Sequence, residues 1–335
     1  MITKDFLKKK VFIVAEIGNN HEGDLERCFS LIDKAVECGV DAVKFQTFEP
    51  TLFYSVNQKD RINQLKKFQI QKEDFIKIKR YCDKKNVVFF STPLDIESAI
   101  FLNSIQPIFK ISSGDNNFFE LIDKVMSFNK PLFISTGLTD ETHIKSIYKR
   151  VKKKWKKTNN SKFLVFLHCI ASYPVIPSEA NLNAITSLKD MFKDVIVGYS
   201  DHCEGIQASI LSVALGAKVV EKHFTDDKNF SNFRDHKISA DPMEMKKLVN
   251  MVRNTEILIG GGKLEVSESE KKNLKLLRRS IAVNKKCLKN SKILEKDLIW
   301  LRPADGLIEK KKILGKSLIK DLKHGEKIYL KDIRK

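Results

Sequence analysis

The sequence predicts a (β/α)8 barrel followed by a small β-rich domain, and three observations support this fold class. Eight short apolar runs recur along the 335-residue chain, and each is followed by a stretch with helical periodicity. Each run ends in polar residues, as expected of barrel strands that open onto an active site. The repeating pattern then stops at Gly260-Gly261-Gly262, a helix stop and hinge.

The apolar runs predict the strands, and the stretches between them predict the helices. The runs lie at residues 11–15, 42–45, 87–91, 108–111, 132–135, 163–167, 195–198 and 219–221. The amphipathic stretches include residues 25–38, 72–84, 96–103, 118–128, 141–154, 182–192, 205–215 and 242–259. Because strand and helix alternate, we expect a parallel sheet with right-handed crossovers. Eight such units in about 250 residues favour a closed barrel over an open sheet.

The end of the chain has a different character. We expect the barrel to span residues 1–262, a linker to follow at 263–277, and a small β-rich domain to occupy 278–335. The linker contains a short polar helix at 267–277. Four strand-like pieces then lie between polar turns, at residues 281–283, 293–294, 299–301 and 327–330.

Composition narrows the class of protein. Hydrophobic residues make up 42% of the chain and charged residues 31%, which is typical of a soluble globular protein. The chain contains no run of 18 apolar residues and no N-terminal secretory pattern, so we expect no membrane span and a cytoplasmic location. The six cysteines are scattered without a CxxC pair, which predicts reduced thiols rather than disulfides or a cysteine zinc site.

The net charge of +19 has two readings: a positive field around an anionic substrate, or a lysine-rich composition of the source genome. The lysines of residues 149–157 lie on a helical face without interleaved stacking aromatics. We therefore expect no nucleic-acid partner.

Two histidines follow neighbouring strands of the predicted barrel, His202 after the seventh and His223 after the eighth. Two imidazoles at adjacent strand ends predict an open divalent-metal site with positions left for water and substrate. Asp201 and Glu221 stand beside them and are candidates for orienting the ligands. A pair of hydrogen-bonding histidines without a metal is the alternative.

Lysines and serines at other strand ends predict an anion pocket. Lys44 and Lys110 supply ammonium groups, and Ser113, Ser135 and Ser200 supply hydroxyls. A compound with both a phosphate and a carboxylate, such as phosphoenolpyruvate, needs this much positive charge. A separate carboxylate, Glu16, ends the first strand and is suited to proton transfer or to binding sugar hydroxyls.

An ordered set of motifs resembles the sialic acid (nonulosonic acid) synthase family. The matching strings are AEIGNNH (15–21), VKFQT (43–47), STP (91–93), KISSGD (110–115), ISTG (134–137), LHC (167–169), GYSDH (198–202), EKHFT (221–225) and DHK (235–237). In the tail, RRSI (278–281) and LRP (301–303) are similar to the family's antifreeze-like domain. Each string alone is weak, whereas the ordered set is specific and covers nearly the whole chain.

The resemblance implies a role for each candidate residue. Phosphoenolpyruvate would be held by Lys44, Thr92, Lys110, Ser113, Ser135 and Ser200. His202 and His223 would bind a divalent metal, usually Mn²⁺, with Mg²⁺ or Co²⁺ as alternatives, and would form the catalytic set with Glu16 and Glu221. The amino sugar would contact Gln46, Tyr173, Asp235 and Arg302. In this family that arginine comes from the partner subunit of a domain-swapped homodimer.

The chain departs from the family pattern on the sugar side. Ala171 stands where sialic-acid-forming members often carry Asn, the loop at 48–71 is short, and residues 230–234 replace a Gly-Pro turn. The resemblance thus implies phosphoenolpyruvate as donor and leaves the acceptor open between N-acetylmannosamine and a 2,4-diacetamido-trideoxy hexose.

Three other functions compete with this reading. Another phosphoenolpyruvate-dependent barrel synthase would make a sugar-acid phosphate or a shikimate precursor, and would need basic residues for a phosphorylated acceptor. A non-catalytic sugar-binding protein would not need two lysines and two histidines together. Nucleic-acid binding through the basic tail would require strong affinity with a steep dependence on salt.

Overall fold

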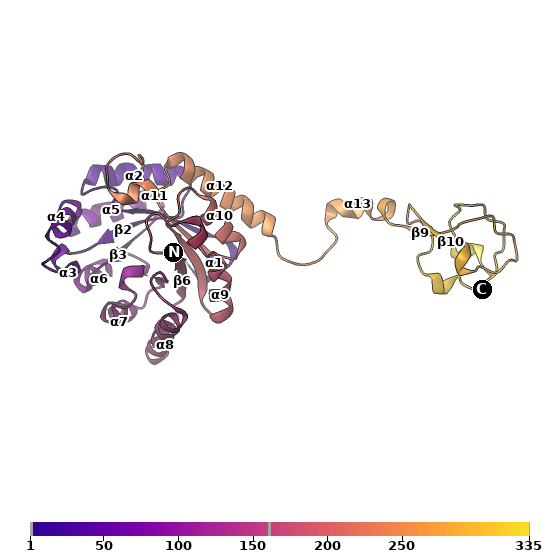
Figure 1. The fold of residues 1–335 in the computed structure, drawn as a ribbon, viewed down its shortest axis with the longest axis horizontal. Coiled ribbons are helices and arrows are strands. Elements are labelled where there is room, and N and C mark those ends of the chain that lie inside the picture. The colour runs from indigo at the N-terminus through magenta and orange to yellow at the C-terminus, as the bar shows by residue number, and fades with distance from the viewer. Residues whose placement is uncertain (1–2, 160–161, 335) are drawn as a thin grey trace. The chain divides into compact units, whose positions relative to one another are not determined.

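The computed structural model describes residues 3–159 and 162–334. The chain forms two compact units, Met1–Gly260 and Gly261–Lys335, which are described separately below (Figure 1). In the first unit, helices surround a cylinder of parallel strands.

Eight strands form the central sheet of the first unit. They are β1 (Phe12–Gly18), β2 (Ala42–Thr47), β3 (Val88–Pro93), β4 (Phe109–Ile111), β5 (Leu132–Ser135), β6 (Leu164–Cys169), β7 (Ile196–Asp201) and β8 (Val219–His223). Their order is β3-β2-β1-β8-β7-β6-β5-β4, and the hydrogen-bonded neighbours run parallel. The two outer members of this order, β3 and β4, also contact each other. The predicted (β/α)8 barrel is therefore confirmed.

Most of the described helices lie between successive strands, as the periodicity predicts, whereas one precedes β1 and two follow β8. They are α1 (Lys4–Lys9), α2 (Leu25–Cys38), α3 (Pro50–Phe53), α4 (Lys59–Phe68), α5 (Lys72–Lys84), α6 (Ile96–Leu102), α7 (Phe119–Ser127), α8 (Glu141–Lys157), α9 (Ala184–Met191), α10 (Gln207–Ala214), α11 (Arg234–Ile238) and α12 (Pro242–Ile259). The segment at 48–71, expected to be a loop, contains the two helices α3 and α4. Side-chain caps fix the starts of several helices in this unit. The Asp24 carboxylate, for example, accepts hydrogen bonds from the first turn of α2.

The interior of the barrel is filled by alternate residues of the strands. The inward-facing cluster contains Leu7, Phe12, Val14, Ala42, Phe90, Ile108, Phe133, Val165, Leu167, Ile196 and Val219, all buried. Because side chains alternate along a strand, the residue two positions further on also points inward. Glu16 follows Val14 in this way, and Glu221 follows Val219. The packed core thus places ionisable groups at the carboxyl-terminal mouth.

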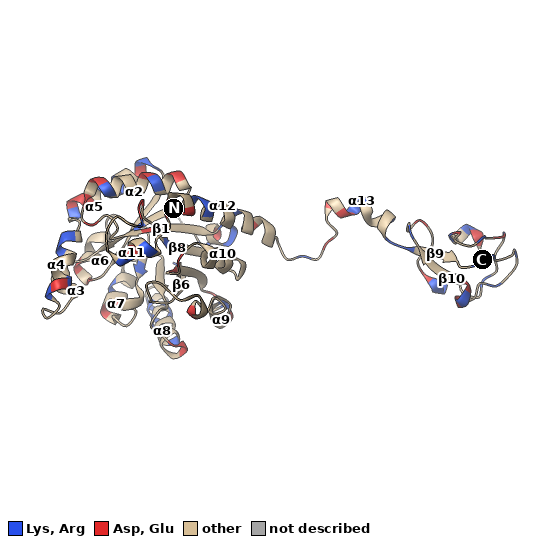
Figure 2. Ribbon diagram, turned by 45° about the horizontal axis from the view of Figure 1, so that its top comes forward, with Lys and Arg blue, Asp and Glu red and all other residues tan. Residues whose placement is uncertain are grey.

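Up to residue 334, the second unit contains one α-helix, one small sheet and three short 3-10 helices. Helix α13 (Glu268–Leu277) begins at the capping box of Ser267 and Glu270. Strands β9 (Ser280–Val283) and β10 (Leu298–Leu301) pair antiparallel. The pieces expected at 293–294 and 327–330 do not form strands. Ile293 and Ile328 instead lie in the apolar core of the unit. Basic residues, blue in Figure 2, occur along this unit together with acidic ones, which are red.

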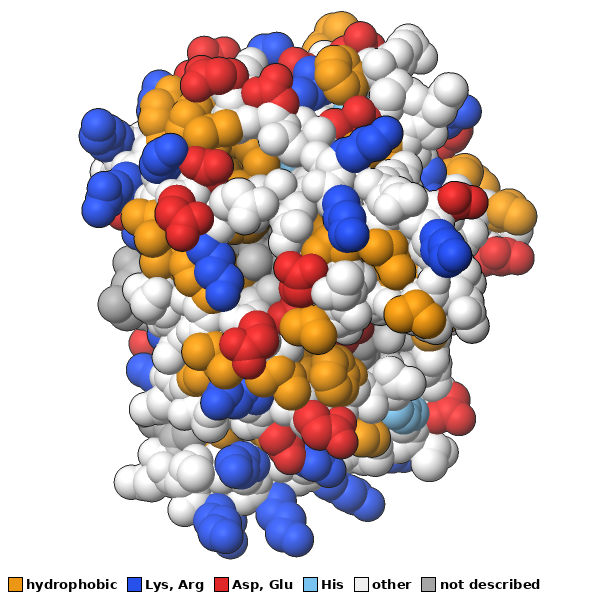
Figure 3. Space-filling model, turned by 90° about the vertical axis from the view of Figure 1, so that its left-hand side faces the viewer, with side chains coloured by type: hydrophobic (Ala, Val, Ile, Leu, Met, Phe, Trp, Pro, Cys, Tyr) orange, Lys and Arg blue, Asp and Glu red, His pale blue; other side chains and the backbone are white. Residues whose placement is uncertain are grey.

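The outer surface of the first unit carries charges of both signs. On the face shown in Figure 3, basic and acidic side chains alternate with apolar ones over most of the area. Within residues 3–159 and 162–334, none of the helices combines the length and the apolar character needed to cross a bilayer.

Candidate active site

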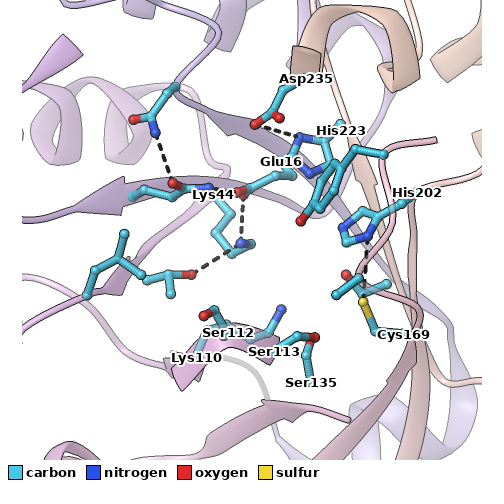
Figure 4. A pocket seen from close by; sticks show the side chains of 18 of the residues that line it. Glu16, Lys44, Lys110, Ser112, Ser113, Ser135, Cys169, His202, His223 and Asp235 are labelled. Carbon is cyan, nitrogen blue, oxygen red and sulfur yellow. Dashed lines mark hydrogen bonds and ion pairs between the residues drawn. The ribbon is translucent and has the colours of Figure 1, made fainter. Parts of the chain in front are cut away.

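A cavity of about 320 Å³ lies at the carboxyl ends of the barrel strands. It is lined by these predicted residues: Glu16, Lys44, Gln46, Thr92, Lys110, Ser113, Ser135, Tyr173, Ser200, His202, Glu221, His223 and Asp235. Figure 4 shows how several of them converge from separate strands and loops. Arg302 belongs to the second unit, after β10, and its side chain is exposed there.

Four buried charged groups form a connected network at the base of the cavity. Lys44 Nζ lies 2.8 Å from Glu16 Oε2 and 3.6 Å from Glu221 Oε2. Lys110 Nζ donates to both carboxylate oxygens of Glu221, at 2.8 and 3.0 Å. Ser200 adds a hydrogen bond of 2.9 Å to the same carboxylate. Two cations and two carboxylates therefore balance one another before any substrate enters.

The network shifts the pKa values of its two carboxylic acids in opposite directions. Burial raises the pKa of Glu16 to about 7, although Lys44 lowers it and Glu221 raises it further. Burial acts on Glu221 in the same direction, but the attraction of Lys110 and Lys44 outweighs it and holds the pKa of Glu221 far below its usual range. Near neutral pH, Glu16 is thus the group that exchanges a proton while Glu221 stays ionised.

Two serines next to this network have free hydrogen-bonding capacity. Among the described residues, the buried Oγ atoms of Ser113 and Ser135 have no hydrogen-bond partner. Asn116, in the loop after β4 that carries Ser113, connects this loop to the end of β5, because its amide donates to the carbonyl oxygens of Ser135 and Gly137 at 3.3 and 2.8 Å. Buried hydroxyls without partners are costly, so their presence here indicates a polar ligand.

The two histidines lie side by side at the opposite part of the cavity. Their ring centroids are 5.4 Å apart, and Tyr173 stacks on His202 at 4.2 Å. His202 Nδ1 donates to the carbonyl oxygen of Ile170 at 2.8 Å, so Nε2 is the nitrogen with a free lone pair when the ring is neutral. Burial lowers the pKa of His202, but Cys169 and the Ile170 carbonyl outweigh it and raise that pKa, so a metal would have to displace a proton from this ring. Burial and the neighbouring His202 hold the pKa of His223 well below its usual value, so its ring is neutral. Neutral imidazoles are the form that binds metal ions.

The surroundings of the histidines fit an open metal site. Among the described residues, His223 Nδ1 and Asp235 Oδ1 are buried without a hydrogen-bond partner. Asp235 Oδ2 lies 3.9 Å from His223 Nδ1. In the part of the chain that the structure describes, no cluster of three or more His, Cys, Asp or Glu side chains is arranged to hold a metal. Two histidine nitrogens would therefore be completed by substrate and water.

The carboxylates beside the histidines have partners other than the two imidazoles. Glu221 faces the cavity but pairs with the two lysines rather than with His202 or His223. Asp201 points out of the cavity, toward α10, and pairs with the buried ammonium of Lys222. The reason is the alternation along β7: Ser200 faces inward, so its neighbour Asp201 faces the helices.

The strand-end histidine His168 also lies outside the cavity. Its Nε2 is 2.9 Å from the carbonyl oxygen of Ala180, and its ring stacks on Tyr199. Of the histidines at the ends of β6 and β7, only His202 lines the site.

Several cavity residues had no signal in the sequence. Apolar side chains of α3, α4 and two loops form one side of the cavity, here called the apolar wall: Phe53, Tyr54, Leu65, Leu94 and Phe233. Cys169 also lines the cavity, and its Sγ lies 3.8 Å from His202 Nδ1. Arg61 and Arg234 complete the rim. The apolar wall could not be predicted because three of its residues come from a segment that was expected to be a loop, and Leu94 and Phe233 come from two separate loops.

Comparisons with known proteins agree with this geometry. Residues 31–264 match the model of the NeuB family. The N,N'-diacetyllegionaminic acid synthase of Campylobacter jejuni is 37% identical over 96% of this chain and 99% of its own length. The human N-acetylneuraminate-9-phosphate synthase is 31% identical over 88% of this chain and 83% of its own. The crystal structure of a sialic acid synthetase from Leptospira borgpetersenii, 35% identical, superimposes with a TM-score of 0.74 over 79% of this chain and 90% of its own. The chain belongs to the NeuB family of nonulosonic acid synthases.

Proposed function

We propose that this protein condenses phosphoenolpyruvate with the aldehyde of an N-acylated amino sugar, giving a nonulosonic acid and phosphate. The observation that carries the proposal is the division of one cavity into a cationic part and a paired-histidine part. A phosphorylated carboxylic acid matches the first part, and a polarised aldehyde matches the second.

Lys44, Lys110 and the free hydroxyls of Ser113 and Ser135 are the binding groups for phosphoenolpyruvate in this proposal. Thr92 supports them, because its Oγ1 accepts a hydrogen bond of 3.2 Å from Lys44 and so fixes the direction of that ammonium. Charge-assisted hydrogen bonds in a buried site are strong, which suits a ligand with both a phosphate and a carboxylate.

His202 and His223 would hold a divalent metal, Mn²⁺ in this proposal, with Mg²⁺ or Co²⁺ as alternatives. When bound, the ion supplies Lewis-acid polarisation of the aldehyde oxygen. Asp235 and Tyr173 are then placed to orient the acceptor, since both lie beside the histidines and line the cavity.

Glu16 is the proton carrier of the proposed reaction. C3 of the enol forms a bond to the aldehyde carbon, and Glu16 gives its proton to the aldehyde oxygen. The carboxylate then takes a proton from the water that adds to C2. The tetrahedral intermediate breaks its C2–O bond, the phosphate leaves with the hydroxyl proton, and the ketone forms. A pKa of about 7 suits a group that must both give and accept a proton near neutral pH.

The acceptor in this proposal is a 2,4-diacetamido-2,4,6-trideoxyhexose. The apolar wall supports this choice, because methyl groups at C6 and on two acetamido groups can be buried against it. Ala171 lines the same cavity and offers no side-chain amide to a more polar sugar. The similarity to the legionaminic acid synthase points to the same kind of acceptor.

The second unit is proposed to act as an antifreeze-like domain in a domain-swapped homodimer, with Arg302 reaching the acylamino end of the sugar in the partner's cavity. Exposed apolar side chains near the junction of the units support an association of this kind; Leu264, Leu276 and Leu277 are examples. An exposed arginine after β10 is suited to such a contact.

An acceptor panel tests the proposal. Purified protein with Mn²⁺ and phosphoenolpyruvate would be given N-acetylmannosamine, its 6-phosphate, or a 2,4-diacetamido-2,4,6-trideoxyhexose, with phosphate release and product mass as readouts. We expect kcat/KM for the trideoxy sugar to exceed that for N-acetylmannosamine by about 10- to 100-fold, the range that an apolar pocket can supply. Absence of release with every acceptor would refute the condensation. Preference for N-acetylmannosamine or its 6-phosphate would refute the acceptor alone.

A further inference from the structure

A buried ion pair lies behind the two histidines, on the side of the strands that faces the helices. Asp201 and Lys222 are register partners on the neighbouring strands β7 and β8, and both side chains have no exposed area. Lys222 Nζ is 3.6 Å from Asp201 Oδ2. Each member of the pair directly precedes one histidine in the chain, His202 or His223.

The contacts of this pair hold the backbone that directly follows His202. Asp201 Oδ1 accepts a hydrogen bond of 2.8 Å from the backbone N–H of Cys203. The ammonium of Lys222 donates to the carbonyl oxygen of Cys203. The two peptide groups that follow His202 are therefore tied, one to Asp201 and the other to the residue that precedes His223.

A third contact connects the pair to the surrounding helix layer. Ser209 of α10 donates its hydroxyl hydrogen to Asp201 Oδ2 at 2.6 Å, and the hydroxyl of Tyr199 donates to Oδ1 at 3.3 Å. Both oxygens of the Asp201 carboxylate therefore have hydrogen-bond or ion-pair partners, and none of these partners lines the cavity. A fully satisfied polar network of this kind restricts the local structure to one arrangement.

A contribution to the stability of the fold does not by itself explain why a buried ion pair is present here. Removing two charges from water is costly, and apolar residues of similar size often replace a buried ion pair without loss of stability. The pair does, however, fix which parts of two strands lie opposite each other, and those parts carry the proposed metal ligands.

We propose that Asp201 and Lys222 are positioning residues that set the separation and orientation of His202 and His223. This inference rests on the proposed metal site. Neither residue touches the substrate or the metal; both act through the backbone that carries the two imidazoles.

The inference is tested by measuring metal affinity separately from enzyme activity. Mn²⁺ binding would be titrated by the EPR signal of the free ion in the full-length wild-type protein and in the Lys222→Met, Asp201→Asn and Asp201→Ala variants, with melting temperatures of the metal-free proteins alongside. We expect Lys222→Met and Asp201→Ala to weaken Mn²⁺ binding by about 10-fold or more, as removal of outer-shell partners does at other metal sites. Asp201→Asn should lose less, because its amide oxygen can still accept from the N–H of Cys203.

Arg253→Met is the matched control. Arg253 pairs with Asp41 at 2.6 Å near the start of the strands, so its loss removes another ion pair of the same barrel without touching the histidines. We expect this variant to melt at a lower temperature with unchanged Mn²⁺ affinity. If Lys222→Met and Asp201→Asn also keep wild-type Mn²⁺ affinity, the positioning role is wrong. If Lys222→Met does not fold, the Mn²⁺ affinity of the nearly isosteric Asp201→Asn variant decides whether the pair has the positioning role. If wild-type protein does not bind Mn²⁺, the proposed metal site itself fails.

Discussion

The ammonium of Lys110 lies 2.8 Å from one carboxylate oxygen of Glu221 and 3.0 Å from the other, and both side chains are almost fully buried. Together with Lys44 and Glu16, this pair sets the charge of the cavity. With Glu16 protonated, two lysines face one carboxylate, and the group carries one net positive charge. With Glu16 ionised, the charges cancel. An anionic substrate therefore meets a positively charged group of side chains below the pKa of Glu16 and a neutral group above it.

The first prediction is that phosphoenolpyruvate binds more weakly as the pH rises through about 7. Burial raises the pKa of Glu16 to about 7 in the free protein, and the incoming anion favours the protonated form. Binding therefore takes up a proton above that pH, and the affinity falls by up to about 10-fold per pH unit. Calorimetric titration between pH 6 and 8.5 measures this dependence. Glu16→Gln should remove most of it, and an equally steep slope in that variant would assign the titration to another group.

The same shift predicts how stability changes with pH. The folded-state pKa of Glu16 lies above its unfolded value, so between about pH 4.5 and 7 the folded protein binds more protons than the unfolded chain. Unfolding then releases protons, and this group makes the protein less stable as the pH rises through that window. The unfolding free energy of Glu16→Gln, relative to wild type, should increase from pH 5 to pH 8 by at most about 3 kcal/mol. Chemical denaturation at both pH values measures it, and a constant difference would contradict the shift.

A third prediction concerns Gly137, in the loop after β5. A Cβ added at this position would lie 2.6 Å from Ser113 Oγ and 3.2 Å from the carbonyl oxygen of Cys169. The serine hydroxyl can rotate away, so we expect Gly137→Ala to fold but to lose a hydroxyl from the anion pocket. The KM for phosphoenolpyruvate should rise by about 10-fold, the cost of one hydrogen bond to a charged group, while the KM for the acceptor changes little. Ser113→Ala is the control, since it removes the same hydroxyl directly and should match the effect.

Strand parity explains how much of the site could be predicted from the sequence. Glu16, Lys44, Lys110 and Glu221 each stand two residues after a side chain that fills the barrel, so their inward direction follows from the alternation. The same rule would have separated Ser200 and His202, which face the cavity, from Asp201, which does not.

Features that depend on tertiary packing could not be predicted in this way. The apolar wall combines residues in and beside helices α3 and α4 with Leu94 and Phe233 of two loops, and no spacing along the chain reveals that these segments meet. The opposite pKa shifts of Glu16 and Glu221 arise from burial and from distances of a few ångströms to two lysines, which no spacing in the sequence reveals.

The fourth prediction separates the two histidines of the cavity from a third one nearby. His202→Ala and His223→Ala should each weaken Mn²⁺ binding by about 100-fold or more, because each removes one of two protein ligands. His168→Ala is the matched control: its imidazole bonds to Ala180 outside the cavity, so this variant should lose stability but keep its Mn²⁺ affinity. Equilibrium dialysis measures the affinities. Unchanged binding in either cavity variant would contradict the metal assignment.

The last prediction uses mixed dimers to test the proposed role of Arg302. If this arginine acts in the partner's cavity, Arg302→Ala should lower kcat/KM for the acceptor and leave phosphoenolpyruvate binding intact. Lys110→Ala should be inactive, because it leaves the buried carboxylate of Glu221 without its main partner. In a heterodimer of the two variants, one cavity combines an intact barrel with an intact second unit. An equal, fully exchanged mixture should therefore recover about a quarter of the wild-type rate, because half of the dimers are mixed and each has one working cavity. Activity no greater than the mean of the two separate variants would show that Arg302 does not act across a dimer.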